Sequence, residues 1–114
     1  MSAIPVLRIV DERAGLRFYV DALGFALDWE HRFEPGLPLY AQVSRGPIVL
    51  HLSAHTGDGT PGAVVWIPVA DVRALVAEFG EAAGEVAVDD DAPGGPTAVV
   101  TDPFGNQLRF AQPA

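Results

Sequence analysis

Two stretches decide the fold of this 114-residue chain: "LRFYVDALGF", residues 16–25, and "VTDPFGNQLRF", residues 100–110. The first predicts a helix that ends at Gly24, because a glycine readily adopts the left-handed conformation that stops a helix. The second contains an Asp-Pro-x-Gly segment of the kind that forms a tight turn between paired strands. The helix prediction depends on apolar residues that recur at helical spacing, namely Leu16, Tyr19, Val20 and Leu23.

The first half of the chain predicts the order strand, helix, strand, strand, strand. Asp11 is the expected N-cap of the helix. Residues 25–33 alternate apolar or aromatic side chains with Ala26, Asp28, Glu30 and Arg32, which is the pattern of a strand with one buried face. The segments expected as strands are 5–10, 25–33, 39–44 and 48–53.

The second half repeats this order, so the chain reads as a duplicated unit. "VDERAGL" (10–16) is similar to "VADVRAL" (69–75), and "LHL" (50–52) corresponds to "LRF" (108–110). A helix is expected to follow the strand at 63–69, to bury Val72, Leu75, Val76 and Phe79, and to end at Gly80 or Gly84. The remaining strands are expected at 84–88, 97–102 and 106–111.

Composition excludes several classes of protein. Fifteen acidic residues against seven basic ones give a formal charge of −8, which repels nucleic acid and would attract cationic ligands. A contribution to solubility alone is the other interpretation of this charge, and the more common one. The chain has no cysteine, so disulfides and thiolate metal sites are excluded. No apolar run is long enough for a membrane span and no signal peptide is recognisable. We therefore expect a soluble, cytoplasmic protein that binds neither nucleic acid nor membrane.

The element order and the two stretches resemble the vicinal oxygen chelate superfamily, which includes glyoxalase I, extradiol dioxygenases, fosfomycin-resistance enzymes and bleomycin-resistance proteins. The resemblance implies an α+β fold of two βαβββ modules, at about residues 4–53 and 63–111, that form curved mixed sheets in a single domain, 1–114. It also implies a homodimer. The residues that carry it are Phe18, Tyr19, Leu23, Gly24, Phe25 and the turn from Asp102 to Asn106.

The histidine spacing argues against a metal site. On a strand, His51 and His55 would lie about 13 Å apart, too far to share one ion. Superfamily metal positions, transferred through the resemblance, fall at Ile4 or Pro5, His51, Ala63 and Arg109. Only His51 among them has a suitable donor atom, so it is a weak metal candidate. We expect no metal, no cofactor and no catalytic residue.

Six residues are candidate ligand-binding residues. The resemblance points His51 and Arg109 into a pocket, and flat aromatic rings could stack on a planar or cationic ligand. Tyr40 alternates with the apolar residues Leu39 and Ala41 and is therefore expected to face away from them. Other roles stay open: Trp66 packing against a helix, Trp29 and Phe33 lying in the core, and Arg109 pairing with Asp102 or Glu34. The full candidate set is Trp29, Phe33, Tyr40, His51, Trp66 and Arg109.

Within the superfamily, "AIPVL" and "LGFALDWEHRFEPG" are most similar to the bleomycin-resistance type. This implies a metal-free protein that sequesters a cationic or aromatic, antibiotic-type small molecule in a groove between two subunits. One alternative is a metal-dependent lyase or dioxygenase-like enzyme with an atypical ligand set, in which His55, Glu34 or a partner subunit assists His51. A small-molecule sensor or accessory domain is a third possibility.

Overall fold

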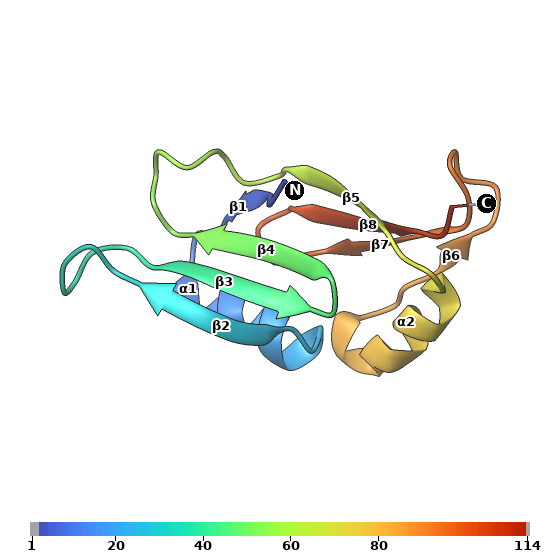
Figure 1. Ribbon diagram of the computed structural model, residues 1–114, viewed down its shortest axis with the longest axis horizontal. Coiled ribbons are helices and arrows are strands. Elements are labelled where there is room, and N and C mark those ends of the chain that lie inside the picture. The colour runs from blue at the N-terminus through green and yellow to red at the C-terminus, as the bar shows by residue number, and fades with distance from the viewer. Residues whose placement is uncertain (1–2, 114) are drawn as a thin grey trace.

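The computed structural model describes residues 3–113 and contains two four-stranded mixed sheets (Figure 1). The first sheet has the order β1-β4-β3-β2 and comprises β1 (Val6–Arg8), β2 (Ala26–His31), β3 (Tyr40–Arg45) and β4 (Ile48–Ser53). The second has the matching order β5-β8-β7-β6 and comprises β5 (Val64–Pro68), β6 (Val88–Asp89), β7 (Thr97–Thr101) and β8 (Gln107–Ala111). The predicted α+β fold of two βαβββ modules is confirmed.

One helical segment accompanies each sheet. Helix α1 (Glu12–Leu16) continues into the π-helical turn η1 (Arg17–Ala22), and α2 (Val72–Phe79) continues into the 3-10 turn η2 (Gly80–Ala83). Asp11 caps α1 by accepting a hydrogen bond from the backbone of Ala14 at 2.8 Å, and Asp71 caps α2 in the same way. In Figure 1 both helices lie along the lower side of the view, beneath the sheets.

The apolar core lies between the helices and the sheets. Helix α2 buries Val72, Leu75 and Phe79, as its spacing predicts. The side chains that face away from the helices are exposed or half-buried on both sheets, which leaves each sheet with one open face. The largest fully buried side chains are Tyr19, Phe25, Phe110, Leu7, Ile9, Leu23, Leu39, Leu50, Leu52, Leu108, Val43 and Val72.

A buried polar network joins the two halves of the chain. Tyr19 Oη donates to Asp102 Oδ2 at 2.8 Å, and the Asn106 amide donates to the same oxygen and to the carbonyl of Arg8. Asn106 Oδ1 accepts from the backbone of Gly62 and Ala63, both at 3.0 Å. Burial is the main cause that raises the pKa of Tyr19, and the adjacent Asp102 carboxylate raises it further. The two stretches that decide the fold therefore meet in one hydrogen-bonded unit.

Strand β2 differs from its predicted pattern. Its register against β3 shifts between Leu27 and Trp29, so that Asp28 is the extra residue of a β-bulge. A bulge places two successive side chains on one face. The expectation that Phe25, Leu27, Trp29, His31 and Phe33 share a buried face was therefore wrong: Phe25 is buried, but every residue of β2 is exposed.

One smaller expectation also changes. The strand expected at 84–88 is reduced to the two-residue β6 (Val88–Asp89); Gly80 and Gly84, both with positive φ, end α2 and η2, and residues 85–87 connect them to β6. Within residues 3–113, no helix has the length and apolar character needed to cross a membrane.

Candidate ligand-binding faces

The open face of the first sheet carries a row of side chains from all four strands. Register places Val6 of β1 beside His51 of β4, His51 beside Gln42 of β3, and Gln42 beside Trp29 of β2. The bulge turns Trp29 to this side. Tyr40 lies one step along β3, on the same face, while its neighbours Leu39 and Ala41 are buried as the sequence predicts.

Trp29, Tyr40 and His51 form an aromatic surface on this face. The rings of Trp29 and Tyr40 stack, with centroids 6.1 Å apart and an interplanar angle of 14°. His51 stands edge-on to both, at 5.3 Å from Trp29 and 5.2 Å from Tyr40. Trp29 is 42% exposed, so the core role left open for it is wrong and its ring is available for stacking against a planar group.

Both ring nitrogens of His51 already have hydrogen-bond partners. Nδ1 lies 2.7 Å from Tyr40 Oη, and Nε2 lies 3.0 Å from Gln42 Oε1. A metal ligand needs a free nitrogen lone pair, which His51 could supply only by breaking one of these bonds. No group of three histidine, cysteine or acidic side chains within the described part of the chain could hold a metal ion.

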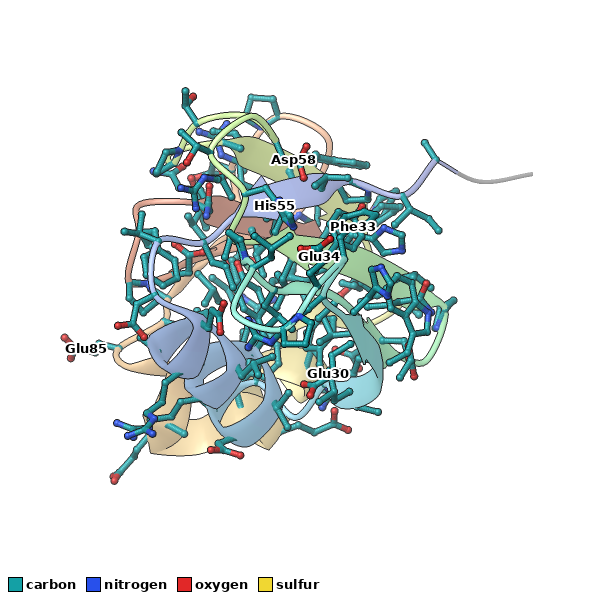
Figure 2. All side chains as sticks on the ribbon, turned by 90° about the vertical axis from the view of Figure 1, so that its left-hand side faces the viewer. Glu30, Phe33, Glu34, His55, Asp58 and Glu85 are labelled. Atoms are coloured by element: carbon teal, nitrogen blue, oxygen red, sulfur yellow. The ribbon has the colours of Figure 1, made fainter. Side chains whose placement is uncertain are left out.

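The remaining histidines lie at the loop end of this face, where the segments 32–39 and 54–63 meet. Phe33 packs edge-on between His31 and His55, at 4.7 Å and 5.7 Å, and is 69% exposed, so it does not lie in the core. Figure 2 shows Phe33, Glu34, His55 and Asp58 at this end. Partial burial is the main cause that raises the pKa of Tyr40, and the negative charge of the Asp58 carboxylate raises it further.

The second sheet has its own open face, centred on Arg109. Trp66 of β5 and Val99 of β7 flank Arg109 of β8. The alternative in which Trp66 packs against a helix is wrong, because Trp66 is 48% exposed. A shallow cavity of ≈ 360 Å³ is lined here by Trp66, Asp89, Ala92, Pro93, Thr97, Val99 and Arg109.

Arg109 pairs with neither acidic residue proposed for it. Its guanidinium donates to Gln107 Oε1 at 3.1 Å, while Asp102 is buried with Tyr19 and Asn106. None of the salt bridges between described residues involves Arg109. An exposed guanidinium beside an indole is therefore left on the second open face.

Strand register also corrects the positions transferred from the superfamily. Val6, rather than Ile4 or Pro5, lies beside His51, and Trp66, rather than Ala63, lies beside Arg109. Valine has no donor atom and the indole N–H only donates, so neither replacement supplies a metal ligand.

The six candidates divide between two sheets. Trp29, Phe33, Tyr40 and His51 belong to the first open face, and Trp66 and Arg109 belong to the second. Sequence reasoning missed Gln42 and Asp28, which form a hydrogen bond to each other on the same face as the aromatic surface. Alternation along β3 indicated that Gln42 shares the face of Tyr40, but no local signal marks the bulge at Asp28.

Comparison with known proteins agrees with this geometry. The family model described as "Glyoxalase superfamily protein" matches residues 1–114. The structure is similar to that of a bleomycin-binding protein from Streptomyces verticillus complexed with copper(II)-bleomycin, at 33% identity and a TM-score of 0.75, over 100% of this chain and 97% of that one.

Two further solved structures share the fold. An antibiotic-binding protein from Streptomyces sp. CB03234 is 24% identical, with a TM-score of 0.70 and coverage of 100% of this chain and 98% of that one. A bleomycin resistance determinant encoded on the transposon Tn5 is 23% identical, with a TM-score of 0.75 over 99% and 98%. A search of curated proteins gave no match. The chain belongs to the glyoxalase superfamily.

Proposed function

We propose that this protein, acting as one domain over residues 1–114, binds and sequesters an aromatic, cationic small molecule of the antibiotic type without a metal ion of its own. The similar protein from Streptomyces verticillus is described as bleomycin-binding and is 33% identical over the whole of this chain. Bleomycin itself is therefore the first ligand to test.

The observation that carries the proposal is the aromatic surface of Trp29, Tyr40 and His51. Trp29, which is exposed, and Tyr40, which is half-buried, stack with nearly parallel rings, and the ring nitrogens of His51 are occupied by protein partners. Such a surface suits stacking better than metal-ion chemistry, because stacking needs ring area and a metal ion needs free lone pairs.

Charge favours a cation as the ligand. The formal charge is −8, and the carboxylates of Asp28 and Asp58 lie close to Gln42 and Tyr40 of this face. Carboxylates and aromatic rings both attract cations, and a cation held over an aromatic face gains further when it is desolvated.

We further propose that two copies of the chain form the complete binding groove. Each chain has two open faces, and exposed apolar side chains occur on both, including Val6 and Trp29 on the first and Trp66 and Val99 on the second. If the first face of one copy packs against the second face of its partner, two-fold symmetry repeats the same contact, so that both open faces of both copies are covered. This packing would also bring Arg109 and Trp66 of one copy towards the aromatic surface of the other.

The function is tested by titrating the protein with bleomycin and with copper(II)-bleomycin and recording tryptophan fluorescence and heat of binding. We expect saturable binding by the wild-type protein. Trp29→Ala removes the larger stacking ring, so its affinity should fall about tenfold or more. Val10→Ala is the matched control, since Val10 is 63% exposed outside the open faces and should bind as the wild type does. Absence of binding by the wild-type protein to both forms would contradict the proposal for this ligand class.

The enzymatic alternative has a separate test. Elemental analysis of protein purified without chelator should find well under about one tenth of an equivalent of divalent metal. A stoichiometric ion that is lost in His51→Ala would favour the metal-dependent enzyme instead.

A further inference from the structure

Asp28 is the bulged residue of β2 and lies exposed on the first open face, next to Trp29 in sequence. The bulge in β2 turns its side chain towards β3, where Oδ1 accepts a hydrogen bond from Ser44 Oγ at 2.9 Å. Its other oxygen, Oδ2, accepts from Gln42 Nε2 at 3.1 Å. Asp28 makes no salt bridge to a described residue, so these neutral donors are the carboxylate's partners.

These bonds determine which group donates and which accepts in the hydrogen bonds that lead from Gln42 through His51 to Tyr40. An ionised carboxylate only accepts, so the amide nitrogen of Gln42 has to face Asp28 and the amide oxygen faces His51. That oxygen also only accepts, and it lies 3.0 Å from His51 Nε2, so Nε2 has to carry the imidazole proton. In the neutral ring Nδ1 is then the acceptor, and Tyr40 Oη, at 2.7 Å, has to donate to it.

We propose that Asp28 is a positioning residue: through Gln42 and His51, it directs the single proton of the Tyr40 hydroxyl to His51 Nδ1. This makes the first open face selective for ligands that carry N–H donors. This inference rests on the proposed function, because it specifies which ligands the same face accepts. The Tyr40 oxygen keeps its lone pairs but has no proton left to offer a ligand, so it can accept from an N–H group and cannot donate to a carbonyl or ether oxygen.

The surroundings of Tyr40 reinforce this selectivity. Asp58 presents a second acceptor near Tyr40, and one of its oxygens already accepts from Ser53 Oγ at 2.7 Å. The other groups against His51 are Val6 on β1 and Trp29 on β2, neither of which carries a charge. The acceptors that this face offers to a ligand beside its aromatic rings are therefore the oxygens of Tyr40 and Asp58.

The hydrogen-bond direction can be tested without any ligand, by nitrogen-15 NMR of the His51 ring at neutral pH. We expect the Nε2–H tautomer in the wild-type protein. Asp28→Ala removes the acceptor that orients Gln42, so a mixture of the two tautomers should appear. Asp28→Asn is the matched control, because its amide oxygen can still accept from Gln42 while its nitrogen donates to Ser44; it should keep the wild-type tautomer. An Nδ1–H tautomer or a charged ring in the wild-type protein, or an unchanged tautomer in Asp28→Ala, would overturn the assignment.

The selectivity is tested with two planar cations of similar shape. 9-Aminoacridine carries N–H donors, whereas 10-methylacridinium carries none. We expect the wild-type protein to prefer 9-aminoacridine by about fivefold, the range of one net hydrogen bond. The preference should disappear in Asp28→Ala and in Tyr40→Phe and persist in Asp28→Asn, which has the same net charge as Asp28→Ala.

The two failures are distinguishable. Equal binding of both cations by the wild-type protein would overturn the selectivity while leaving the proposed binding function intact. Failure of both cations and of bleomycin to bind would overturn the proposed function and the selectivity together, and the NMR result would still decide whether Asp28 sets the tautomer of His51.

Discussion

Tyr19 connects parts of the chain that lie 83 residues apart in sequence, through one hydrogen bond from its hydroxyl to Asp102. The ring is fully buried and packs edge-on against Phe18 and Phe25. The hydroxyl meets a carboxylate that is itself buried, and an unsatisfied buried carboxylate oxygen is costly. The hydroxyl of Tyr19 therefore links the two halves of the chain, whereas its ring packs against aromatic residues of the first half.

Replacing Tyr19 by Phe should lower the free energy of unfolding by about 1–3 kcal/mol at neutral pH, because Asp102 loses one of its buried donors. The variant should also change the alkaline behaviour. Folding raises the pKa of Tyr19 above its unfolded value of about 10. The protonated Tyr19 hydroxyl therefore stabilises the fold fully below about pH 10, and this stabilisation declines as the pH rises from there towards the raised pKa of the folded state. Urea unfolding at neutral pH and at about pH 10.5 measures both effects.

Tyr40→Phe is the matched control for this experiment. The pKa of Tyr40 is also raised, but that side chain is only half-buried, so it should account for a smaller part of the alkaline loss. A Tyr19→Phe protein that loses stability above about pH 10 as steeply as the wild type does would contradict the assignment of this loss to Tyr19.

At the scale of elements, polar caps mark where the helices begin. Asp71 Oδ1 accepts from the backbone of Ala74 at 3.0 Å and satisfies one of the free N–H groups at the start of α2. The eight-residue helix gains the rest of its stability by burying one apolar side. A short helix of this kind depends on its cap, because few intrahelical bonds support it.

Asp71→Ala should therefore destabilise the protein by about 1 kcal/mol, whereas Asp71→Asn should cost much less, since its amide oxygen can cap the same N–H group. Urea unfolding of the two variants beside the wild type makes the comparison. Equal losses in both variants would show that charge at the helix start, rather than the capping bond, is what matters.

Local patterns identified the helices and most strands, because helical spacing, caps and turn residues act over a few positions. The chain's second strand shows where such patterns fail. Its alternation left a core position open for Trp29, but the bulge at Asp28 turns that side chain to the open face. A bulge arises from pairing with a neighbouring strand, and that pairing is absent from any window of sequence around residue 28.

For the whole molecule, the open faces predict a homodimer in solution, which light scattering coupled to size exclusion should detect. Trp66→Glu places a charge on the exposed apolar part of the second face and should shift the protein to monomer at micromolar concentration. Val10→Glu adds the same charge at a residue that is 63% exposed outside both faces and should stay dimeric. A wild-type monomer at high concentration would contradict the composite groove while leaving the first face to be tested alone.

The duplicated strand and helix order, the cap at Asp11 and the turn from Asp102 to Asn106 could be predicted from the sequence, because these depend on local periodicity and on the conformations that particular residues favour. The sequence also indicated that Tyr40 faces away from the core, and the resemblance it carries placed His51 and Arg109 on matching strands.

Only the tertiary structure decided which side chains gather at the site. The stacking of Trp29 on Tyr40, the use of both His51 nitrogens and the role of Asp28 all depend on the register between β2, β3 and β4. Register brings together residues that are distant along the chain, and a single inserted residue in one strand changes which face they share. Caps, turns and helices depend on residues that are close together in the sequence, whereas a binding face depends on how distant strands pair.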